Sequence, residues 1–355
     1  MSETAWYWIH FLASHTLTQN ANAIIRKISP RNTSYLLYGP SHLLMRVTSR
    51  CNQRCLFCPR KAPSVPRRRF EFDDVLIDRF AEMVDRFRGV SSLTLTGGEP
   101  FLNKDIFEMM EYANSRSIRV FASTNGAVLD DKIDQIIRSP LSHLNISLDA
   151  VTPSDYESMH GEPKSIFYKV LDNIAGLVEE REKFNHHLEL GVSYICTKGN
   201  FRRIPDMIQL AREIGVDALI FYNLVPFDLP GFSKDDCLYE EDPEVAEVIE
   251  SVEEFSPELS VMMPALYRSV ILNRFCRMPF TTLCIDGEGF VSVCCQSTSQ
   301  GKYGDVGNIL RDENVWNNQH FRRMREILMN DSKPLPELCT VCPHMNRPYK
   351  IISGE

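Results

Sequence analysis

Short runs of hydrophobic, β-branched and aromatic residues alternate with longer amphipathic stretches between about residues 43 and 226. Six of these runs have the length and composition of buried strands, at residues 43–48, 92–96, 119–122, 143–148, 188–195 and 218–222. Helical periodicity fills the intervals: residues 74–88 place Leu76, Phe80, Met83, Val84 and Phe87 on one stripe. Residues 131–138, 165–180 and 201–214 repeat that pattern. Six β–α units in series predict an α/β fold with a parallel sheet covered by helices.

The segments on either side of these units differ from them in residue composition and in hydrophobic periodicity. Residues 227–275 are loop-like and then acidic, and we expect a helical connector there with a helix from about 242 to 255. Residues 1–42 are expected to be a helical extension, whose aromatic stretch 5–13 lacks a basic flank and is interrupted by His10, unlike a signal peptide. A membrane-surface helix is the alternative. No run of about 18 apolar residues occurs, so we expect no membrane span and a cytoplasmic protein.

Unusual residues follow the carboxyl ends of four predicted strands. A three-cysteine cluster follows the first strand, Gly-Gly-Glu-Pro at 97–100 the second, Ser-Thr-Asn-Gly at 123–126 the third, and Asp149 the fourth. In parallel α/β folds, active-site groups gather beyond these strand ends. The four groups are therefore predicted to converge on one rim.

Composition narrows the classes of function. The 355 residues carry a formal net charge of −8, which argues against a nucleic-acid partner. Of eleven cysteines, three lie in residues 51–58 and six in residues 276–342. Clustered thiols in a long chain without an export signal predict metal ligands rather than a disulfide framework.

The first cluster has the spacing C-x3-C-x2-C, with Cys51, Cys55 and Cys58. Three thiolates on a tight loop can hold three corners of a 4Fe-4S cube and leave one iron open to a ligand. A structural zinc ion would need a fourth ligand close by, and residues 45–69 contain no further Cys or His. The spacing therefore predicts an iron–sulfur cluster.

With an aromatic residue before the third cysteine and Gly-Gly-Glu-Pro after the next strand, the sequence resembles the radical S-adenosylmethionine superfamily. The resemblance covers roughly residues 43–226 and implies a partial (β/α)6 TIM-like barrel. It also implies that the open iron chelates the methionine part of S-adenosylmethionine. An electron from the cluster would then cleave the sulfonium and release a 5′-deoxyadenosyl radical.

The resemblance assigns cofactor-binding roles to residues near the first two strands. Phe57 would lie near the adenine. Gly97 and Gly98 would leave room for close approach of a ligand and, with Glu99, would receive the methionine ammonium. Pro100 would fix the turn.

Four further residues are implied at the third and fourth strands. Ser123 and Asn125 would lie near the methionine carboxylate and ribose, and Ser147 and Asp149 near the ribose. Ordinary loop capping is the alternative for all four, since Ser, Asn and Asp are common turn residues.

The C-terminal region carries a second pattern. A hairpin-like segment at 282–294 has alternating apolar residues around a turn rich in Asp and Gly. Gly-Asn-Ile at 307–309, Trp-Asn at 316–317 and a C-x2-C pair follow it. This order resembles the auxiliary-cluster tails called SPASM and twitch, and it implies a small domain at 276–355 built from a β-hairpin and a helix.

No cysteine follows Cys342, so the resemblance is to a twitch tail with one auxiliary 4Fe-4S cluster. The implied ligands are Cys276, Cys294, Cys339 and Cys342. Two other cysteines are expected to be packed or spare, Cys284 because it lies within a strand and Cys295 because it adjoins a ligand. Four thiolates suit a cluster to electron transfer, and a zinc site is the alternative.

Several reactions are compatible with these patterns. Twitch-tailed dehydrogenases of aminocyclitol pathways, which the cysteines resemble, imply oxidation of a small polar substrate such as a sugar, aminocyclitol or nucleotide-like molecule. Epimerisation would require a thiol, such as Cys196 or Cys237, to return a hydrogen atom. Peptide maturation is a further alternative, although the 42 residues before the first strand are too few for the usual peptide-binding domain. A simple electron carrier would not need the motif at 97–100.

Residues 60–69 contain five basic side chains just past the first cysteine cluster. They could bind a substrate phosphate, or remain a solvated loop. They could also dock an acidic reducing partner such as flavodoxin or ferredoxin.

Overall fold

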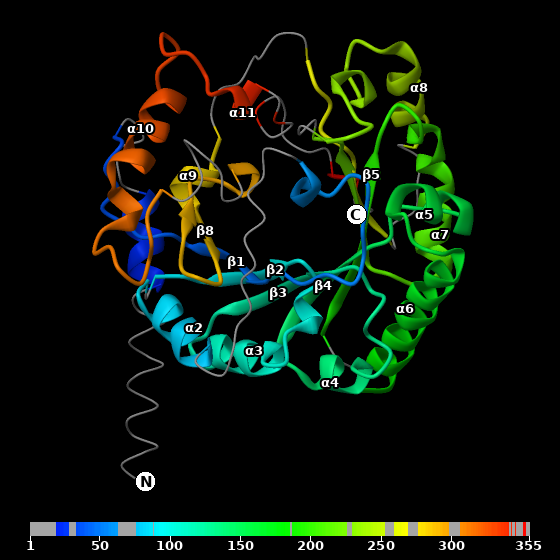
Figure 1. Ribbon diagram of the computed structural model, residues 1–355, viewed down its shortest axis with the longest axis horizontal. Helices are drawn as coiled ribbons and strands as arrows, with labels where there is room; N and C mark the ends of the chain where they lie inside the picture. The colour runs from blue at the N-terminus through cyan, green and yellow to red at the C-terminus, as the bar shows by residue number, and fades with distance from the viewer. Residues whose placement is uncertain are drawn as a thin grey trace, which may run out of the picture.

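A curved mixed sheet organises the chain in the computed structural model (Figure 1). The structure describes residues 19–27, 33–62, 76–87, 89–184, 187–225, 229–252, 259–268, 276–297, 306–340, 342, 345 and 351–352. Within these residues the sheet has ten strands in the order β10-β7-β6-β5-β4-β3-β2-β1-β8-β9.

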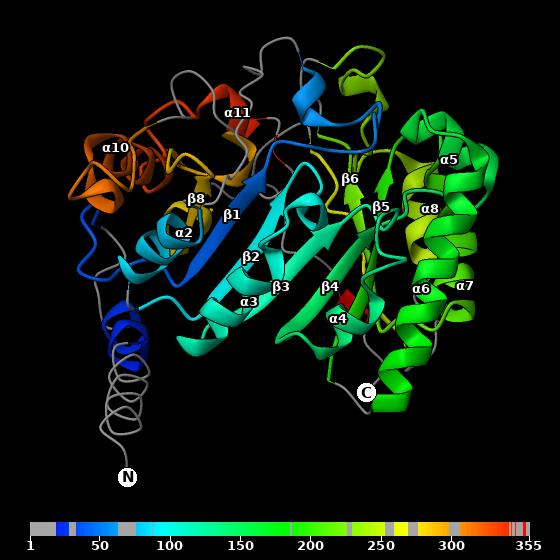
Figure 2. The same cartoon turned by 60° about the horizontal axis from the view of Figure 1, so that its bottom comes forward.

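The six predicted strands form the centre of this sheet and are all parallel. They are β1 (His42–Thr48), β2 (Ser92–Gly97), β3 (Arg119–Thr124), β4 (Leu141–Ser147), β5 (Glu189–Cys196) and β6 (Ala218–Asn223). The intervening helices are α2 (Leu76–Asp85), α3 (Ile106–Ser115), α4 (Ile133–Arg138), α5 (Pro153–His160), α6 (Lys164–Phe184) and α7 (Ile204–Glu213). Helices α2, α3, α4 and α6 lie along the outer side of the curved sheet (Figure 2). The predicted α/β partial barrel is confirmed.

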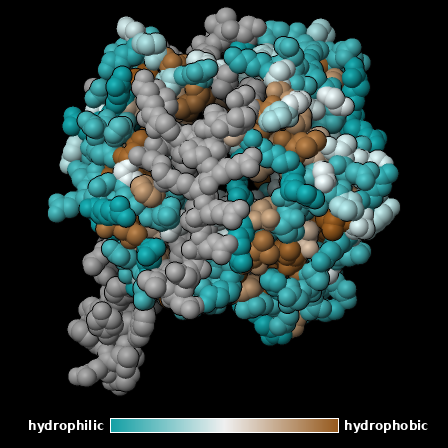
Figure 3. Space-filling view, viewed as in Figure 1, coloured by the Kyte–Doolittle hydropathy of each residue, from teal (hydrophilic) through white to brown (hydrophobic). Residues whose placement is uncertain are grey.

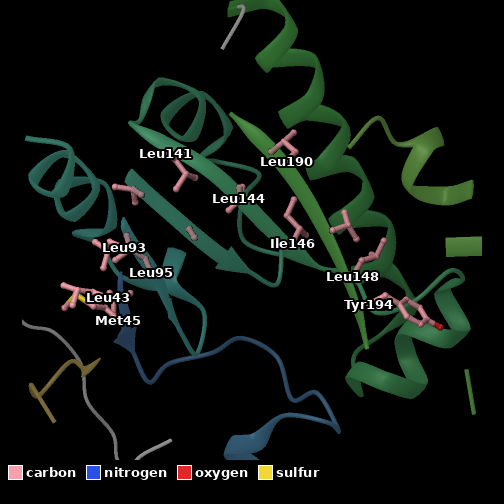
Figure 4. Packing of buried hydrophobic residues seen from close by; sticks show 14 of the residues in the cluster. Leu43, Met45, Leu93, Leu95, Leu141, Leu144, Ile146, Leu148, Leu190 and Tyr194 are labelled. Atoms are coloured by element: carbon pink, nitrogen blue, oxygen red, sulfur yellow. The ribbon is translucent and has the colours of Figure 1, made fainter. Parts of the chain in front are cut away.

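Alternation along the strands explains this layering. In β1, Leu43, Met45 and Val47 are buried, whereas the residues between them are partly exposed up to Arg46. The buried set packs with the inner faces of the helices, as the labelled side chains in Figure 4 show. Each fully buried Leu or Met contributes about 1.5–3 kcal/mol of transfer free energy, so this face holds the helices against the sheet.

The sheet is wider than the six predicted strands. Strand β7 (Ser260–Met262) pairs parallel with β6, and β8 (Thr282–Asp286) pairs parallel with β1. Two antiparallel strands complete the edges, β9 (Val291–Ser292) on β8 and β10 (Ile351–Ile352) on β7. The predicted hairpin of the C-terminal region is therefore part of the main sheet, because its first strand satisfies the open edge of β1.

Segment 227–275 is not wholly helical, which corrects the expectation of a helical connector. Its described residues contain the 3-10 helix η4 (Lys234–Asp236), α8 (Pro243–Ser251) and strand β7. Asp242 caps α8 by accepting a hydrogen bond from the backbone N–H of Glu244. A three-residue strand has too few positions for alternation to identify it, and it forms because the edge of β6 offers unpaired backbone groups.

Part of the N-terminal extension is helical, at residues 19–27. The Asn22 side chain donates to the carbonyl oxygens of Gly39 and Gly89, both at 3.2 Å, and so ties this helix beside β2. The aromatic stretch 5–13 lies outside the described residues. No helix in the described ranges is both long and apolar enough to cross a bilayer. Hydrophilic residues cover most of the face in Figure 3, with hydrophobic patches between them.

A buried arginine joins the C-terminal region to the N-terminal segment. Arg325 lies on α10 (Gln319–Leu328) and is fully buried. Its guanidinium donates to the carbonyl oxygens of Pro279 at 2.8 Å, Ser34 at 3.1 Å and Trp316 at 2.8 Å, and to the amide oxygen of Asn317 at 2.9 Å. Pro279 belongs to α9 (Met278–Thr281) and Trp316 to η6 (Val315–Asn317). One side chain thus holds three separate segments together.

Candidate functional site

The three-cysteine loop follows β1 and is supported from the side by α5. The backbone N–H of Leu56 donates to the carbonyl oxygen of Met159 at 2.9 Å, and that of Cys58 donates to the carbonyl oxygen of Cys55 at 3.3 Å. Burial raises the pKa of the Cys55 thiol above its usual range, and nearby Asp149, Cys58 and Cys51 raise it further. The three thiols are therefore neighbours on one tight loop, as the motif requires.

Gly97 and Gly98 bring the second strand against this loop. The backbone N–H of Gly98 donates to the carbonyl oxygen of Thr48 at 2.8 Å. A Cβ atom on Gly97, whose φ is +142°, would lie 2.4 Å from that oxygen, and one on Gly98 would lie 1.9 Å from the carbonyl oxygen of Arg50. The close approach that needs these glycines is thus to the protein's own cysteine loop.

Glu99 is buried, and its carboxylate is held by the end of β3. It accepts hydrogen bonds from the backbone N–H of Phe101 at 3.1 Å, the Thr124 hydroxyl at 2.8 Å and the backbone N–H of Asn125 at 2.7 Å. Burial raises the pKa of Glu99, and these three donors act in the opposite direction. Pro100 begins the short 3-10 helix η2 (Pro100–Leu102) and is buried. Glu99 therefore locks the second strand end to the third.

Asn125 links the third strand end to the cysteine loop. Its side-chain amide donates to the Asn52 side chain at 2.8 Å and lies 3.9 Å from the Cys51 sulfur. Its amide oxygen accepts from the backbone N–H of Ala127 at 2.9 Å, which is the loop-capping role that the sequence left open. Asn125 thus combines a structural cap with a position beside a predicted cluster ligand.

Asp149 follows β4 in the left-handed region of backbone conformation, with φ of +52°, which is uncommon for a residue other than glycine. One carboxylate oxygen accepts from the backbone N–H of Ile195 at 2.8 Å. The other is buried with no hydrogen-bond partner among the described residues, and it lies 3.6 Å from Nε2 of His160. Burial raises the pKa of Asp149 to about 7. A strained, buried acid at a strand end is typical of a functional position.

Phe57 belongs to a small apolar cluster that also includes Ile195 of β5 and Leu224, the residue after β6. Phe57 packs against a small buried cluster that includes Cys237 and Tyr267. The Cys237 sulfur donates to the carbonyl oxygen of Leu224 at 3.4 Å. Cys237 is fully buried within this apolar cluster, so the structure gives it a packing role.

The face of the sheet turned away from the helices carries polar side chains from each of the strands β1 to β5. The strand register aligns these positions across the sheet. Its polar members are Arg46, Thr94, Thr96, Ser123, Asn145, Ser147 and Ser193. All but Ser193 are partly exposed, unlike the fully buried residues that alternate with them on the helix side. This inner face is suited to a polar ligand.

A small hydrogen-bond network on this face leaves one acceptor unused. The Asn145 amide donates to the Ser193 hydroxyl at 3.1 Å, and that hydroxyl lies 3.5 Å from the Ser147 hydroxyl. The Asn145 amide oxygen is buried and has no hydrogen-bond partner among the described residues. Since buried polar atoms are normally paired, this oxygen is a candidate contact for a ligand.

A second group of cysteines surrounds a small cavity in the C-terminal region. Its walls combine sulfur with apolar side chains and are formed by Cys276, Met278, Pro279, Cys294, Cys295, Gln296, Met324, Leu328, Leu338, Cys339, Cys342 and Met345. All four predicted auxiliary ligands belong to this set. Burial raises the pKa of Cys276 to about 11, as expected for a thiol in such a pocket.

Cys295 also lines this cavity, although the sequence analysis expects it to be packed or spare. It begins the 3-10 helix η5 (Cys295–Ser297), where consecutive side chains do not alternate as they do in a strand. Burial raises its pKa well above the usual range, and the neighbouring Cys294, Cys284 and Cys342 raise it further. Cys284, in strand β8, is absent from the cavity wall.

Two predicted features lie partly beyond what the structure describes. Of the basic segment, Arg60 and Lys61 are described, and their side chains donate to the carbonyl oxygens of Ser49 and Arg54. Residues 63–69 of that segment are outside the described ranges.

In the parts that are described, no group of three or more His, Cys, Asp or Glu side chains is arranged to hold a metal ion.

The cysteines of the loop after β1 and those around the small cavity in the C-terminal region form two separate thiol-rich groups, the arrangement expected of an iron–sulfur protein with two centres. The chain belongs to the Radical SAM superfamily, whose model matches residues 45–231, more than half of the sequence. A second model, SPASM, described as an iron–sulfur cluster-binding domain, matches residues 276–343. The protein is therefore a member of the radical S-adenosylmethionine enzyme superfamily that carries an iron–sulfur cluster-binding domain.

Named relatives share this catalytic core. The chain is 28% identical over 203 residues to an Fe-coproporphyrin III synthase of Methanosarcina barkeri, covering 52% of this chain and 47% of that protein. It is 26% identical over 176 residues to a probable GTP 3′,8-cyclase of Methanocaldococcus jannaschii, covering 49% and 55%. The chain thus spans about half the length of the curated relatives it matches.

Among solved structures, SuiB of Streptococcus suis bound to S-adenosylmethionine has a similar fold. The TM-score is 0.63 with 16% identity, over 87% of this chain and 72% of SuiB. At that identity the likeness concerns the fold alone.

Proposed function

We propose that the protein oxidises a small polar substrate, such as a sugar, aminocyclitol or nucleotide-like molecule, by removing a hydrogen atom from carbon. The observation that carries this proposal is the polar inner face of the sheet, with the unpaired amide oxygen of Asn145 at its centre. A hydroxyl or amino group of the substrate would donate to that oxygen. An apolar substrate would leave this oxygen and its polar neighbours desolvated without partners, at a cost of about 1–3 kcal/mol each.

In this proposal Cys51, Cys55 and Cys58 hold the first cluster. With S-adenosylmethionine bound, it supplies a 5′-deoxyadenosyl radical for hydrogen abstraction. Gly97, Gly98, Glu99 and Pro100 shape the loop that faces the cofactor, through the backbone contacts described above. Phe57, Ser123, Asn125, Ser147 and Asp149 complete the proposed set of cofactor contacts.

The second half of the reaction needs an electron acceptor. Loss of a hydrogen atom leaves a substrate carbon radical, and loss of one proton and one electron from that radical gives a C=O or C=N bond. We assign the electron to an auxiliary cluster held by Cys276, Cys294, Cys339 and Cys342. Their shared cavity supports this assignment. An external one-electron donor, such as flavodoxin or ferredoxin, would reduce the first cluster.

Cys196 supports oxidation over epimerisation by its position. It is fully buried on β5 and shares the face of Val192 and Tyr194, which packs against the helices. A thiol on that side cannot return a hydrogen atom to a substrate on the inner face. With Cys237 in an apolar cluster, neither Cys196 nor Cys237 is suited to donate hydrogen.

The relatives and similar structures span several substrate classes. They include an Fe-coproporphyrin III synthase and a probable GTP 3′,8-cyclase, and SuiB has been solved bound to the precursor peptide SuiA. For this reason the substrate class is inferred from the chain's own residues.

The test is turnover in deuterium oxide with a panel of sugars, aminocyclitols, nucleotide sugars and short peptides. A true substrate raises 5′-deoxyadenosine formation above the substrate-free rate, and Cys55→Ala abolishes it. Oxidation gives a product two mass units lighter with no carbon-bound deuterium from solvent. Asn145→Leu should raise KM for that substrate. An isomer carrying one carbon-bound deuterium, or stimulation by peptides alone, would refute the proposal.

A further inference from the structure

A buried histidine lies directly behind the first cysteine loop. His160 ends α5 and is fully buried. The Tyr156 ring stacks on it with centroids 4.1 Å apart and planes within 10°, and the Phe57 ring meets it edge-on at 5.4 Å. These two rings fix the plane of the imidazole, so its two nitrogens have defined partners.

One of those nitrogens faces a predicted cluster ligand. Nδ1 of His160 lies 3.1 Å from the Cys55 sulfur and 3.1 Å from the side-chain oxygen of Gln53. The Gln53 amide in turn donates to the Tyr156 hydroxyl at 2.6 Å, which fixes its orientation. On the other side of the ring, Nε2 lies 3.2 Å from the carbonyl oxygen of Leu148. A contact of 3.1 Å between nitrogen and sulfur is a short hydrogen-bond distance.

A thiolate bound to iron has no hydrogen and can only accept. We therefore infer that Nδ1–H of His160 donates a hydrogen bond to the Cys55 sulfur and sets the reduction potential of the first cluster. A donor to a ligand sulfur stabilises the reduced cluster, which carries one more negative charge, and so raises its potential. The contact needs a hydrogen on Nδ1, and the side-chain oxygen of Gln53, 3.1 Å away, is a second acceptor for that hydrogen.

His160 also connects the cluster loop to the fourth strand end. Its Nε2 is 3.6 Å from the unpaired carboxylate oxygen of Asp149. The imidazole thus bridges Cys55 and the proposed ribose contact. Because His160 is shielded by Tyr156 and Phe57, it is a positioning residue that acts through Cys55.

The experiment compares His160→Asn with His160→Leu in the full chain, reconstituted anaerobically. The two side chains have nearly the same shape, but only Asn can place a nitrogen donor near the Nδ1 position. The midpoint potential is measured by redox titration monitored by electron paramagnetic resonance, on the signal that changes when S-adenosylmethionine is added. The signal that does not respond reports the auxiliary cluster and serves as an internal control.

We expect Leu to shift the responsive cluster to a more negative potential and Asn to restore most of the wild-type value, with the control signal unchanged. If Leu loses that cluster while Asn keeps it, iron content reports the same difference. Equal behaviour of Asn and Leu, whether both are shifted, unshifted or without the cluster, overturns the inference.

The inference rests on the proposed assignment of Cys55 as a ligand, which is tested separately. Cys55→Ala that retains a cluster responsive to S-adenosylmethionine would refute that assignment, whatever the potentials of the His160 variants. No substrate enters either measurement, so the proposed oxidation is not at issue in them.

Discussion

The Arg325→Met substitution removes a buried guanidinium while keeping most of its aliphatic volume. Four hydrogen bonds disappear, to the oxygens of Pro279, Ser34, Trp316 and Asn317. At about 1 kcal/mol net for each bond, the loss is about 4 kcal/mol. The stacking of the guanidinium 4.5 Å above the Trp316 ring adds about 0.5–1 kcal/mol.

The cost of burying the charged guanidinium offsets part of this loss of stability, because the variant no longer bears that cost. Burial lowers the pKa of Arg325 to about 9, so the charged form is held in an unfavourable medium, and methionine escapes that cost. The Asn317 amide oxygen keeps the backbone N–H of Leu36 at 2.9 Å, but the carbonyl oxygens of Pro279, Ser34 and Trp316 lose the guanidinium in the variant. We expect these orphaned oxygens to dominate and the free energy of unfolding to fall by about 2–4 kcal/mol.

The assay is anaerobic urea denaturation of the reconstituted protein, with Arg323→Ala as the matched control. Arg323 is exposed on the same helix, and its removal should change stability by less than about 0.5 kcal/mol. Since α9 begins two residues after Cys276, the Arg325 variant should also lose auxiliary-cluster iron first under mild chelation. A variant as stable as wild type, or more stable, would show that desolvation outweighs the hydrogen bonds.

Three further predictions follow from the two sites. Reconstituted protein should bind about eight irons, and replacing the three cysteines of the first loop by alanine should leave about four; bound zinc or four irons in wild type would contradict two clusters. Gly98→Ala should lose the first cluster, because the added Cβ would lie 1.9 Å from the Arg50 carbonyl oxygen. The control Gly199→Ala, whose Cβ would have its nearest contact at 3.6 Å, should retain the cluster. Iron analysis of the two variants measures the difference. In the folded apoprotein, burial raises the pKa of Asp149 from 3.8 to about 7. Between these two pH values the carboxyl ionises in the unfolded chain but stays protonated in the folded one. The free energy of unfolding should therefore fall by up to about 4 kcal/mol as pH rises from about 4 to 7. Asp149→Asn should flatten that decline in urea titrations, and parallel profiles for the two proteins would argue against it.

The central barrel could be predicted from the sequence because each strand there is locally encoded. The run 43–48 nearly matches β1 (His42–Thr48), since its buried residues alternate along a continuous strand. The edges of the sheet could not be predicted. Alternation at 282–294 indicates a strand there, but its pairing with β1, which joins Thr282 to His42, has no local signal in either segment.

The site residues also include some that the sequence could predict and some that it could not. Motif spacing identified the cysteine groups, because a cluster demands thiols at fixed intervals. His160 and Gln53 could not be predicted as site residues, because neither belongs to a motif with a fixed spacing from the cysteines. Cys295 is expected from the sequence to be packed or spare because it adjoins a predicted ligand, whereas it begins a 3-10 helix and lines the same cavity as that ligand. In each case the missing information is how separate segments meet in space.

The place of β8 beside β1 has a consequence for synthesis. β1 precedes the other described strands of the sheet in synthesis, and its second neighbour begins at Thr282. At about 5–20 residues per second, one edge of β1 stays without a partner for on the order of 10–50 s. During that interval the rim that holds the first cysteine loop is flanked by an unfinished sheet. The residues of the first cysteine loop are therefore synthesised well before those that line the second cavity.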